Sequence, residues 1–204
     1  VFADVCEDTA NIDPRAVEAV VTPRTKAIVA VDYAGHPADL ESLRHIADKH
    51  GLLLIEDAAH SLGSSIAGSP VGSIADLTAF SFYPTKNITT AEGGAVAARN
   101  RELLDRAKTF SRQGLVRDPD LFRIQIEGQW HQEVQEFGLN YRLPDVLAAL
   151  GLSQLQRLEG FRQTRAGVKQ KYDEIFLSHA ELRTPVQRPG VQPMWHLYPL
   201  LVPA

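Results

Sequence analysis

Compact apolar runs alternate with amphipathic segments over the first half of the chain. The runs cover residues 26–33, 52–56, 76–83 and 94–98, and the first is rich in β-branched residues, which is typical of a buried strand. A side chain that can accept hydrogen bonds from the first helical turn precedes each amphipathic segment, at Asp13, Asp39 and Asn100. Strands separated by such helices predict an α/β fold with a mostly parallel sheet that is covered on both faces.

The second half of the chain predicts helices and a linker rather than further strand–helix units. Asp145 is placed to cap a helix and Gly160 to interrupt it, and a second helix with a polar face follows. A proline-containing linker then leads to a last strand at residues 197–202. We therefore divide the chain into the core of a large domain, residues 1–158, and a connecting helix with the start of a small C-terminal domain, residues 159–204.

Residues 112–139 form the longest stretch without clear periodicity. A stretch of that length inside a compact domain is either functional or mobile, and the sequence leaves both readings open. Its candidate functional side chains are Arg112, Arg117 and Trp130.

The composition of the 204 residues, with 44% hydrophobic and 23% charged residues, is that of an ordinary globular protein. A formal net charge of −4 provides no global basic field, so we expect neither nucleic acid nor anionic lipid as a partner. No apolar run approaches the roughly 20 residues of a membrane-spanning helix, so we expect no membrane partner. The single Cys6 excludes an intramolecular disulfide and fits a reducing compartment, the cytoplasm. The glycine fingerprints of dinucleotide and triphosphate sites are absent from the sequence, which disfavours those functions.

Lys86 and Asp57 carry the candidate chemistry, because each closely follows a predicted strand. Ligands of parallel sheets bind outside the carboxyl ends of the strands, so we expect both side chains at one site. A lysine can bond to the aldehyde of pyridoxal phosphate, and a carboxylate can keep the pyridine nitrogen protonated so that the ring accepts electrons. Taken singly, Lys86 is also compatible with a surface lysine, and Asp57 with a helix cap or a metal ligand.

A metal site at Asp57 would need further ligands nearby, and Glu56 and His60 are the candidates. Glu56 points to the opposite side if the strand continues, so we expect no metal. Ala59 is small enough to lie flat against a planar ring, and His60 is either a hydrogen-bond partner of that ring or a structural imidazole. Ser81 ends a predicted strand, where its hydroxyl can bind a phosphate or satisfy the local backbone.

These residues, in their local sequences, resemble those of the DegT/DnrJ/EryC1/StrS sugar aminotransferase family, a branch of fold-type I pyridoxal phosphate enzymes. The resemblance runs from Val1 to about residue 200. It rests on five stretches, which are residues 31–39, 56–63, 81–87, 91–94 and 138–144. The stretch Glu127–Trp130 is most similar to nucleotide-sugar 4-aminotransferases of the pseudaminic acid and aminoarabinose routes.

The resemblance implies the large domain of a fold-type I transferase, a three-layer α/β sandwich that binds pyridoxal 5′-phosphate. Lys86 would then hold the cofactor covalently and act as general acid and base, and Asp57 would pair with the pyridine nitrogen. Ala59 and His60 would lie against the ring, and Ser81 would bind the phosphate.

Three further residues receive roles from the resemblance. Asn140 would reach the phosphate of the neighbouring subunit's cofactor, which implies a homodimer with a shared active site. Tyr141 and Arg142 would lie near the bound nucleotide-sugar. The implied reaction moves an amino group from an amino-acid donor, glutamate, to a keto nucleotide-sugar, and the implied setting is cell-surface polysaccharide biosynthesis.

The chain departs from the family in its extent. The family's N-terminal portion of roughly a hundred residues, with a phosphate loop and a stacking aromatic, precedes the matching region. The first residues, 1–5, and the last strand look like strands already under way, so we expect a piece of a longer protein that by itself can be inactive. Two alternatives stay open, a non-catalytic sensor or assembly protein and a sugar dehydratase. Lys86 argues against the dehydratase, which has histidine at that position.

Overall fold

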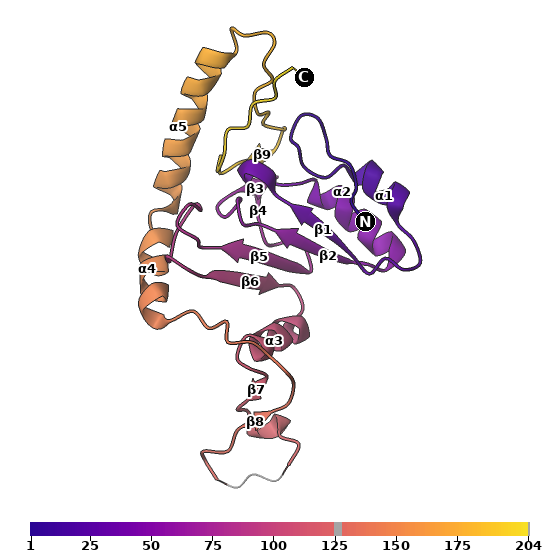
Figure 1. Ribbon diagram of the computed structural model, residues 1–204, viewed down its shortest axis with the longest axis vertical. Helices are drawn as coiled ribbons and strands as arrows, with labels where there is room; N and C mark the ends of the chain where they lie inside the picture. Colours follow the sequence, from indigo (N-terminus) through magenta and orange to yellow (C-terminus); the bar gives the residue numbers. More distant parts are fainter. Residues whose placement is uncertain (125–127, 204) are drawn as a thin grey trace.

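A four-stranded sheet forms the centre of the computed structural model, which describes residues 1–124 and 128–203 (Figure 1). Its strands, in spatial order, are β1 (Ala27–Val31), β2 (Leu53–Asp57), β5 (Leu77–Ser81) and β6 (Gly94–Ala98). The first three strands are parallel, and β6 runs antiparallel to β5. The reversal follows from the connection between β5 and β6, residues 82–93, which has turns but no crossover helix. The predicted mostly parallel sheet is confirmed, with an antiparallel edge.

Three helices of the first half begin where the sequence predicts. Asp13 accepts a hydrogen bond from the second residue of α1 (Pro14–Val20), and Asp39 from the third residue of α2 (Leu40–His50). Asn100 does the same for α3 (Arg101–Phe110). Each contact satisfies one of the free N–H groups of the first turn, which is worth about 1 kcal/mol.

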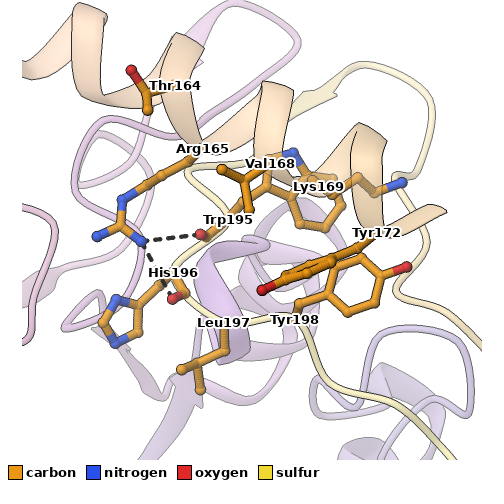
Figure 2. Close-up of a pocket in the computed structure, with 9 residues that line it drawn as sticks. All are labelled: Thr164, Arg165, Val168, Lys169, Tyr172, Trp195, His196, Leu197 and Tyr198. Atoms are coloured by element: carbon orange, nitrogen blue, oxygen red, sulfur yellow. Dashed lines mark hydrogen bonds between the residues drawn. The ribbon is translucent and has the colours of Figure 1, made fainter. Parts of the chain in front are cut away.

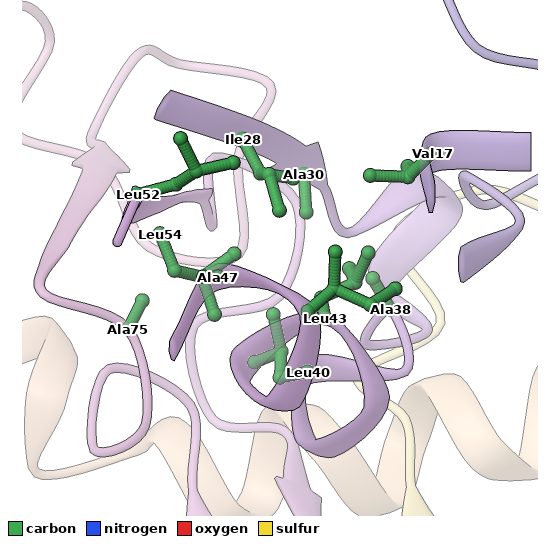
Figure 3. Packing of buried hydrophobic residues seen from close by; sticks show 11 residues of the cluster. Val17, Ile28, Ala30, Ala38, Leu40, Leu43, Ala47, Leu52, Leu54 and Ala75 are labelled. Atoms are coloured by element: carbon green, nitrogen blue, oxygen red, sulfur yellow. The ribbon is translucent and has the colours of Figure 1, made fainter. Parts of the chain in front are cut away.

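The hydrophobic core lies between β1, β2 and the two helices α1 and α2 (Figure 3). Alternate residues of the strands point into it, and the apolar face of α2 packs against them. The most deeply buried side chains, each at most 1% exposed, include Leu40, Leu43 and Leu54. Burying one such side chain contributes about 1.5–3 kcal/mol, so this layer fixes the orientation of the parallel strands.

The opposite face of the sheet differs from the expectation of cover on both sides. Val29 and Val31 of β1 are 56% and 44% exposed, and Val96 of β6 is 49% exposed. The described helices α1 and α2 lie on the other face, and the two helices α4 and α5 lie beyond the carboxyl end of β5 (Figure 1). The residues described here therefore cover one face of the sheet only.

The helices α4 (Asp145–Leu155) and α5 (Leu158–Phe176) correct two predictions. Pro144, not Asp145, is the N-cap, because proline is suited to the non-helical position and Asp145 to the positive end of the helix dipole. The break falls at residues 156–157, and Gly160 lies inside α5. An exposed glycine costs about 1 kcal/mol there, which the rest of the 19-residue helix tolerates.

Short strands replace the longer ones expected at the chain ends. Val5 forms only an isolated bridge with Ile12, and Leu201 one with Arg183, so the predicted terminal strands are wrong. The segment that follows α5 instead contributes β9 (Val191–Gln192) to a small antiparallel sheet. Its partners are β3 (Ser65–Ile66) and β4 (Ser69–Pro70), in the order β4-β3-β9.

Residues 112–124 and 128–139 contribute a two-stranded ribbon beyond α3, away from the main sheet (Figure 1). Its elements are β7 (Leu115–Val116), the short helix η2 (Pro119–Leu121) and β8 (Glu133–Val134). The buried Glu133 accepts hydrogen bonds from the N–H groups of Arg123 and Ile124, and these hydrogen bonds lower its pKa to about 2 against the opposing effect of burial. Glu127, on which part of the family resemblance depends, lies outside the described residues.

Candidate active site at the carboxyl edge of the sheet

The register of the sheet puts Asp57 and Ser81 on the same face. Asp57 pairs with Ala79, and residues that pair across strands share a face, as do residues two apart in one strand. Glu56 instead pairs with Thr78 and is buried on the opposite face, as the sequence predicts. The carboxylate of Asp57 and the hydroxyl of Ser81 therefore lie together on the open face, at the carboxyl ends of adjacent parallel strands.

A tight turn orients the Asp57 carboxylate. Its Oδ1 atom accepts a hydrogen bond from the N–H of Ala59 at 3.0 Å, and the N–H of Ala58 donates to the carbonyl of Ala79 at 2.9 Å. Within the described part of the chain no hydrogen bond reaches the second oxygen, Oδ2. One oxygen holds the turn, and the other can accept a proton donor from a ligand.

Asn87 joins the Lys86 loop to the loop that follows Asp57. Its Nδ2 group donates to the carbonyls of His60, at 2.7 Å, and of Leu62, at 3.2 Å. Asn87 is only 5% exposed, so these two bonds are shielded from competing water. Lys86 and the Asp57–His60 turn are thereby held at one edge of the sheet.

His60 responds to both charged groups. Burial lowers the pKa of its imidazole first, the positive charge of Lys86 lowers it further, and the carboxylate of Asp57 opposes the shift. The Nδ1 atom of His60 is buried and has no hydrogen-bond partner within the described residues. A buried polar atom without a partner is costly, so this nitrogen is available to a polar group of a ligand.

The ring of His196 packs on His60, with centroids 4.4 Å apart and planes inclined by 37°. The His196 N–H donates to the carbonyl of Ala34 at 2.8 Å, which ties this C-terminal segment to the turn after β1. Burial lowers the pKa of His196 to about 4, with further contributions from His60, Lys86 and Arg165. The ring is therefore neutral at pH 7.

Gly35 makes this approach possible. A Cβ atom on Gly35 would lie 2.8 Å from the backbone nitrogen of His196 and 3.1 Å from the His60 carbonyl oxygen. The φ angle of Gly35 is +91°. Both the space and the backbone conformation favour glycine. The turn after β1 thus sits between the two histidine segments.

A cavity of about 220 Å³ lies beside this cluster, between α5 and residues 195–198 (Figure 2). Arg165 of α5 donates from Nη1 to the carbonyls of Trp195, at 3.2 Å, and His196, at 3.4 Å. Two further polar groups of the lining, Lys169 and the Tyr198 hydroxyl, both donate to Asp173. The cavity is lined mainly by aromatic and aliphatic atoms, and Arg165 fixes the backbone of His196 from its far side.

The other predicted site residues receive weaker support. Ser81 Oγ accepts one long hydrogen bond, 3.4 Å, from the N–H of Tyr83, which is compatible with both of its readings. Asn140 accepts from Arg142 at 2.9 Å and bridges to Arg112, and Tyr141 is 71% exposed. No hydrogen bond or ion pair within residues 1–124 and 128–203 joins Asn140, Tyr141 or Arg142 to Lys86 or Asp57. Their roles remain predictions.

Sequence reasoning missed Asn87, His196 and Arg165. Asn87 stands next to Lys86, and its position beside a candidate catalytic lysine was the available signal. His196 and Arg165 reach the site from the far end of the chain, and nothing in their local sequence marks them. The structure contains no cluster of three or more potential metal ligands in the part of the chain that it describes, and no helix there is long and apolar enough to cross a membrane.

The fold and the site define an α/β protein with a lysine, a carboxylate and a neutral imidazole at the carboxyl edge of its sheet. The chain belongs to the DegT/DnrJ/EryC1/StrS aminotransferase family, whose sequence model matches residues 1–204.

Named relatives place it further. It is 41% identical over 202 residues to the spore coat polysaccharide biosynthesis protein SpsC of Bacillus subtilis, covering 99% of this chain and 52% of that protein. It is 36% identical over 204 residues to the UDP-4-amino-4,6-dideoxy-N-acetyl-beta-L-altrosamine transaminase of Campylobacter jejuni, covering 98% of this chain and 52% of that protein. The chain thus spans about half the length of the curated relatives it matches.

A solved structure agrees with the fold. PseC of Helicobacter pylori, an aminotransferase involved in the biosynthesis of pseudoaminic acid, superposes with a TM-score of 0.89 at 37% identity. The match covers 99% of this chain and 52% of that chain. The predicted family and fold class are confirmed.

Proposed function

We propose that the protein containing this chain is a pyridoxal phosphate-dependent aminotransferase that transfers an amino group from an amino-acid donor, glutamate, to a keto nucleotide-sugar. The observation that supports the proposal is the link through Asn87, which ties the loop of Lys86 to the loop that follows Asp57. The electrostatic effect of the Lys86 and Asp57 side chains at His60 supports it as well.

The residues present fit the cofactor. Within the described residues Asp57 has a carboxylate oxygen without a donor, which suits the protonated ring nitrogen, and His60 has a buried nitrogen without a partner. Ala59 is small enough to lie beside the ring. Ser81 lies on the same face as Asp57 and is suited to the phosphate. Lys86 would hold the aldehyde carbon covalently. When bound, the cofactor supplies an electron sink for a carbanion next to the transferred nitrogen.

The protein side chains divide the proton handling between them. Asp57 holds the proton on the ring nitrogen, because a carboxylate stabilises a neighbouring positive charge. With the cofactor bound, Lys86 would be the group that carries a proton between the cofactor carbon and the substrate carbon, which requires that it reach both atoms. His60 and His196 are neutral near pH 7, so they add no competing positive charge beside Lys86.

The substrate assignment is the finer part of the proposal. The named relatives include a UDP-sugar transaminase and a spore coat polysaccharide protein, which supports a nucleotide-sugar acceptor and cell-surface polysaccharide synthesis. Tyr141 and Arg142 are the proposed sugar-nucleotide contacts. Asn140 is the proposed contact to the partner subunit's cofactor in a homodimer, and we place the enzyme in the cytoplasm. The division at residue 158 into large-domain core and connecting helix also stands as a proposal.

Covalent capture tests the proposal. Full-length protein is loaded with pyridoxal phosphate, reduced with borohydride and digested, and mass spectrometry locates the pyridoxyl group. We expect it on the peptide containing Lys86, absent in Lys86→Ala and retained in the surface control Lys49→Ala. Modification elsewhere, or none in wild type, would overturn the assignment. Glutamate-dependent amination of a keto nucleotide-sugar then tests the substrate class.

A further inference from the structure

Two carboxyl groups, Asp32 and Glu56, are buried beneath the candidate site. Both side chains are 0% exposed. Asp32 directly follows β1, and its N–H donates to the carbonyl of Asp57 at 3.0 Å. Glu56 is the neighbour of Asp57 in β2 and points to the opposite face of the sheet. Neither carboxyl belongs to the candidate cofactor contacts, so their burial needs a separate explanation.

Hydrogen-bond donors reach three of the four carboxyl oxygens. Asp32 Oδ1 accepts from the N–H of Ala38 at 2.9 Å, and Oδ2 accepts from the Ser61 hydroxyl at 2.6 Å. Glu56 Oε2 accepts from the Thr78 hydroxyl at 2.7 Å, and also from a backbone N–H at 3.0 Å. Glu56 Oε1 is buried and has no donor within the described residues.

The sheet register brings the two carboxyls to the same buried face, because Ala30 pairs with Glu56 and Asp32 lies two residues beyond Ala30. Burial, and then the charge of Glu56, raises the pKa of Asp32 well above its usual range. Burial also raises the pKa of Glu56, and the hydrogen bond from the Thr78 hydroxyl opposes that rise. A carboxyl group can donate a hydrogen bond only when it is protonated, so Asp32 can satisfy the buried Glu56 Oε1 only if it keeps its proton.

No cation neutralises the pair in the part of the chain that the structure describes. Among the elements packed against it, α2 contributes Arg44, which is paired with Asp48 and with Asp76, the residue before β5. His36, in the turn before α2, contacts the carbonyl of Pro37 instead. Two buried carboxylates without a cation would repel each other strongly in a low-dielectric interior.

We propose that Asp32 and Glu56 share one proton, with Asp32 donating to Glu56 Oε1, and that this pair positions the loop from Asp57 to His60. The proton supplies the donor that Glu56 Oε1 otherwise lacks. Calling the pair positioning residues for a cofactor rests on the proposed function; the shared proton itself does not.

The pair holds both ends of the loop. At the start, the buried Glu56 directly precedes Asp57 in β2, and the N–H of Asp32 donates to the Asp57 carbonyl. At the end, the hydroxyl of Ser61, the residue after His60, donates to Asp32. Loss of the shared proton would charge both carboxyls and separate them, and the loop would lose these two attachments together.

The pH dependence of unfolding tests the shared proton. In the unfolded chain both carboxyls ionise near pH 4, whereas the folded pair keeps one proton to higher pH. The stabilisation by the shared proton is therefore complete below about pH 4. It is lost as pH rises through the raised pKa of the folded pair. Between the two values the unfolding constant of the full-length wild type should gain up to a factor of ten per pH unit from this pair.

Amide substitutions should reduce that contribution, because they remove the partner carboxyl while burial still raises the pKa of the carboxyl that remains. In Glu56→Gln and in Asp32→Asn an amide N–H replaces the shared proton, so the difference in slope from wild type should appear in both. The surface control Glu18→Gln should keep the wild-type slope above neutral pH, because Lys49 lowers the pKa of Glu18 and its effect falls at acid pH. Equal slopes in wild type and both amide variants would overturn the proposal.

Infrared spectroscopy of the wild type tests it without relying on the variants. At neutral pH we expect one C=O stretching band of a protonated carboxyl group, shifted by hydrogen bonding and lost in Asp32→Asn. Its absence in folded wild type would refute the shared proton.

Retention of pyridoxal phosphate tests whether the pair positions the loop. Glu56→Leu cannot accept from Thr78, so its retention should fall at least tenfold relative to Glu56→Gln, and equal retention would refute that role. A protonated pair in a wild-type protein that binds no pyridoxal phosphate would instead count against the proposed function alone.

Discussion

The imidazole rings of His60 and His196 pack with their centroids 4.4 Å apart, although the two residues are far apart in the sequence. One ring follows the loop of the candidate carboxylate, and the other belongs to the segment that returns after the long helix α5. The contact makes the C-terminal segment part of the candidate active site.

Replacing His196 with phenylalanine tests the electrostatic side of this contact. The pKa of His196 is lowered to about 4, so the unfolded chain binds a proton between that value and about 6.5 that the folded chain does not. The stabilisation is therefore present above pH 6.5 and is lost as pH falls toward 4. We expect His196→Phe to reduce the change in unfolding free energy over this pH range, measured by urea unfolding. Phenylalanine keeps an aromatic ring against His60 but binds no proton. The same loss of unfolding free energy at acid pH in the variant as in wild type would contradict the prediction.

Gly35→Ala should destabilise the same region. The added methyl group would clash with the backbone nitrogen of His196 and with the His60 carbonyl oxygen. The φ angle of +91° adds backbone strain of about 1–3 kcal/mol. Gly51→Ala is the matched control, because φ there is +63° but no atom lies within 4 Å of the new methyl group. A larger loss of unfolding free energy in Gly35→Ala than in the control would confirm the steric contribution, and equal losses would exclude it.

Asn87→Ala should loosen Lys86 from the Asp57–His60 loop. The substitution leaves the carbonyls of His60 and Leu62 without their donor, at a cost of about 1–3 kcal/mol. We expect lower stability together with weaker pyridoxal phosphate binding, measured by absorbance titration. Asn100→Ala, which removes the cap of α3 away from the site, should lower stability by about 1 kcal/mol and leave binding unchanged. Wild-type affinity in Asn87→Ala would argue against a link between the loops.

Asp57→Asn separates the charge of the carboxylate from its role in the turn. The amide oxygen can still accept from the Ala59 N–H, so the fold should survive. Without the negative charge, the pKa of the bound pyridine nitrogen should fall by about 1–3 units. Titration of the bound cofactor's visible absorbance measures that shift, and an unshifted titration would remove Asp57 from the site.

Local signals predicted much of this fold from sequence. Asp13, Asp39 and Asn100 begin their helices as expected, because capping depends on residues within one turn. The alternation of strand residues predicted that Glu56 and Asp57 point to opposite faces, which the pairing confirms. The closeness of the Lys86 and Asp57 loops was predicted from strand ends alone.

Other features depend on contacts between distant segments and could not be predicted this way. The antiparallel course of β6 follows from the turns of residues 82–93, whose path is set by partners such as Asn87. The exposure of one sheet face could not be predicted, because an apolar strand pattern predicts burial whether or not another layer covers that face. His196 and Arg165 enter the site only through the folding of the C-terminal segment onto Gly35.

The hydrogen bonds from Arg165 to the Trp195 and His196 carbonyls fasten the C-terminal segment to the long helix α5. The placement of the His196 ring against His60 therefore depends on where α5 lies, although none of the candidate cofactor contacts belongs to this helix.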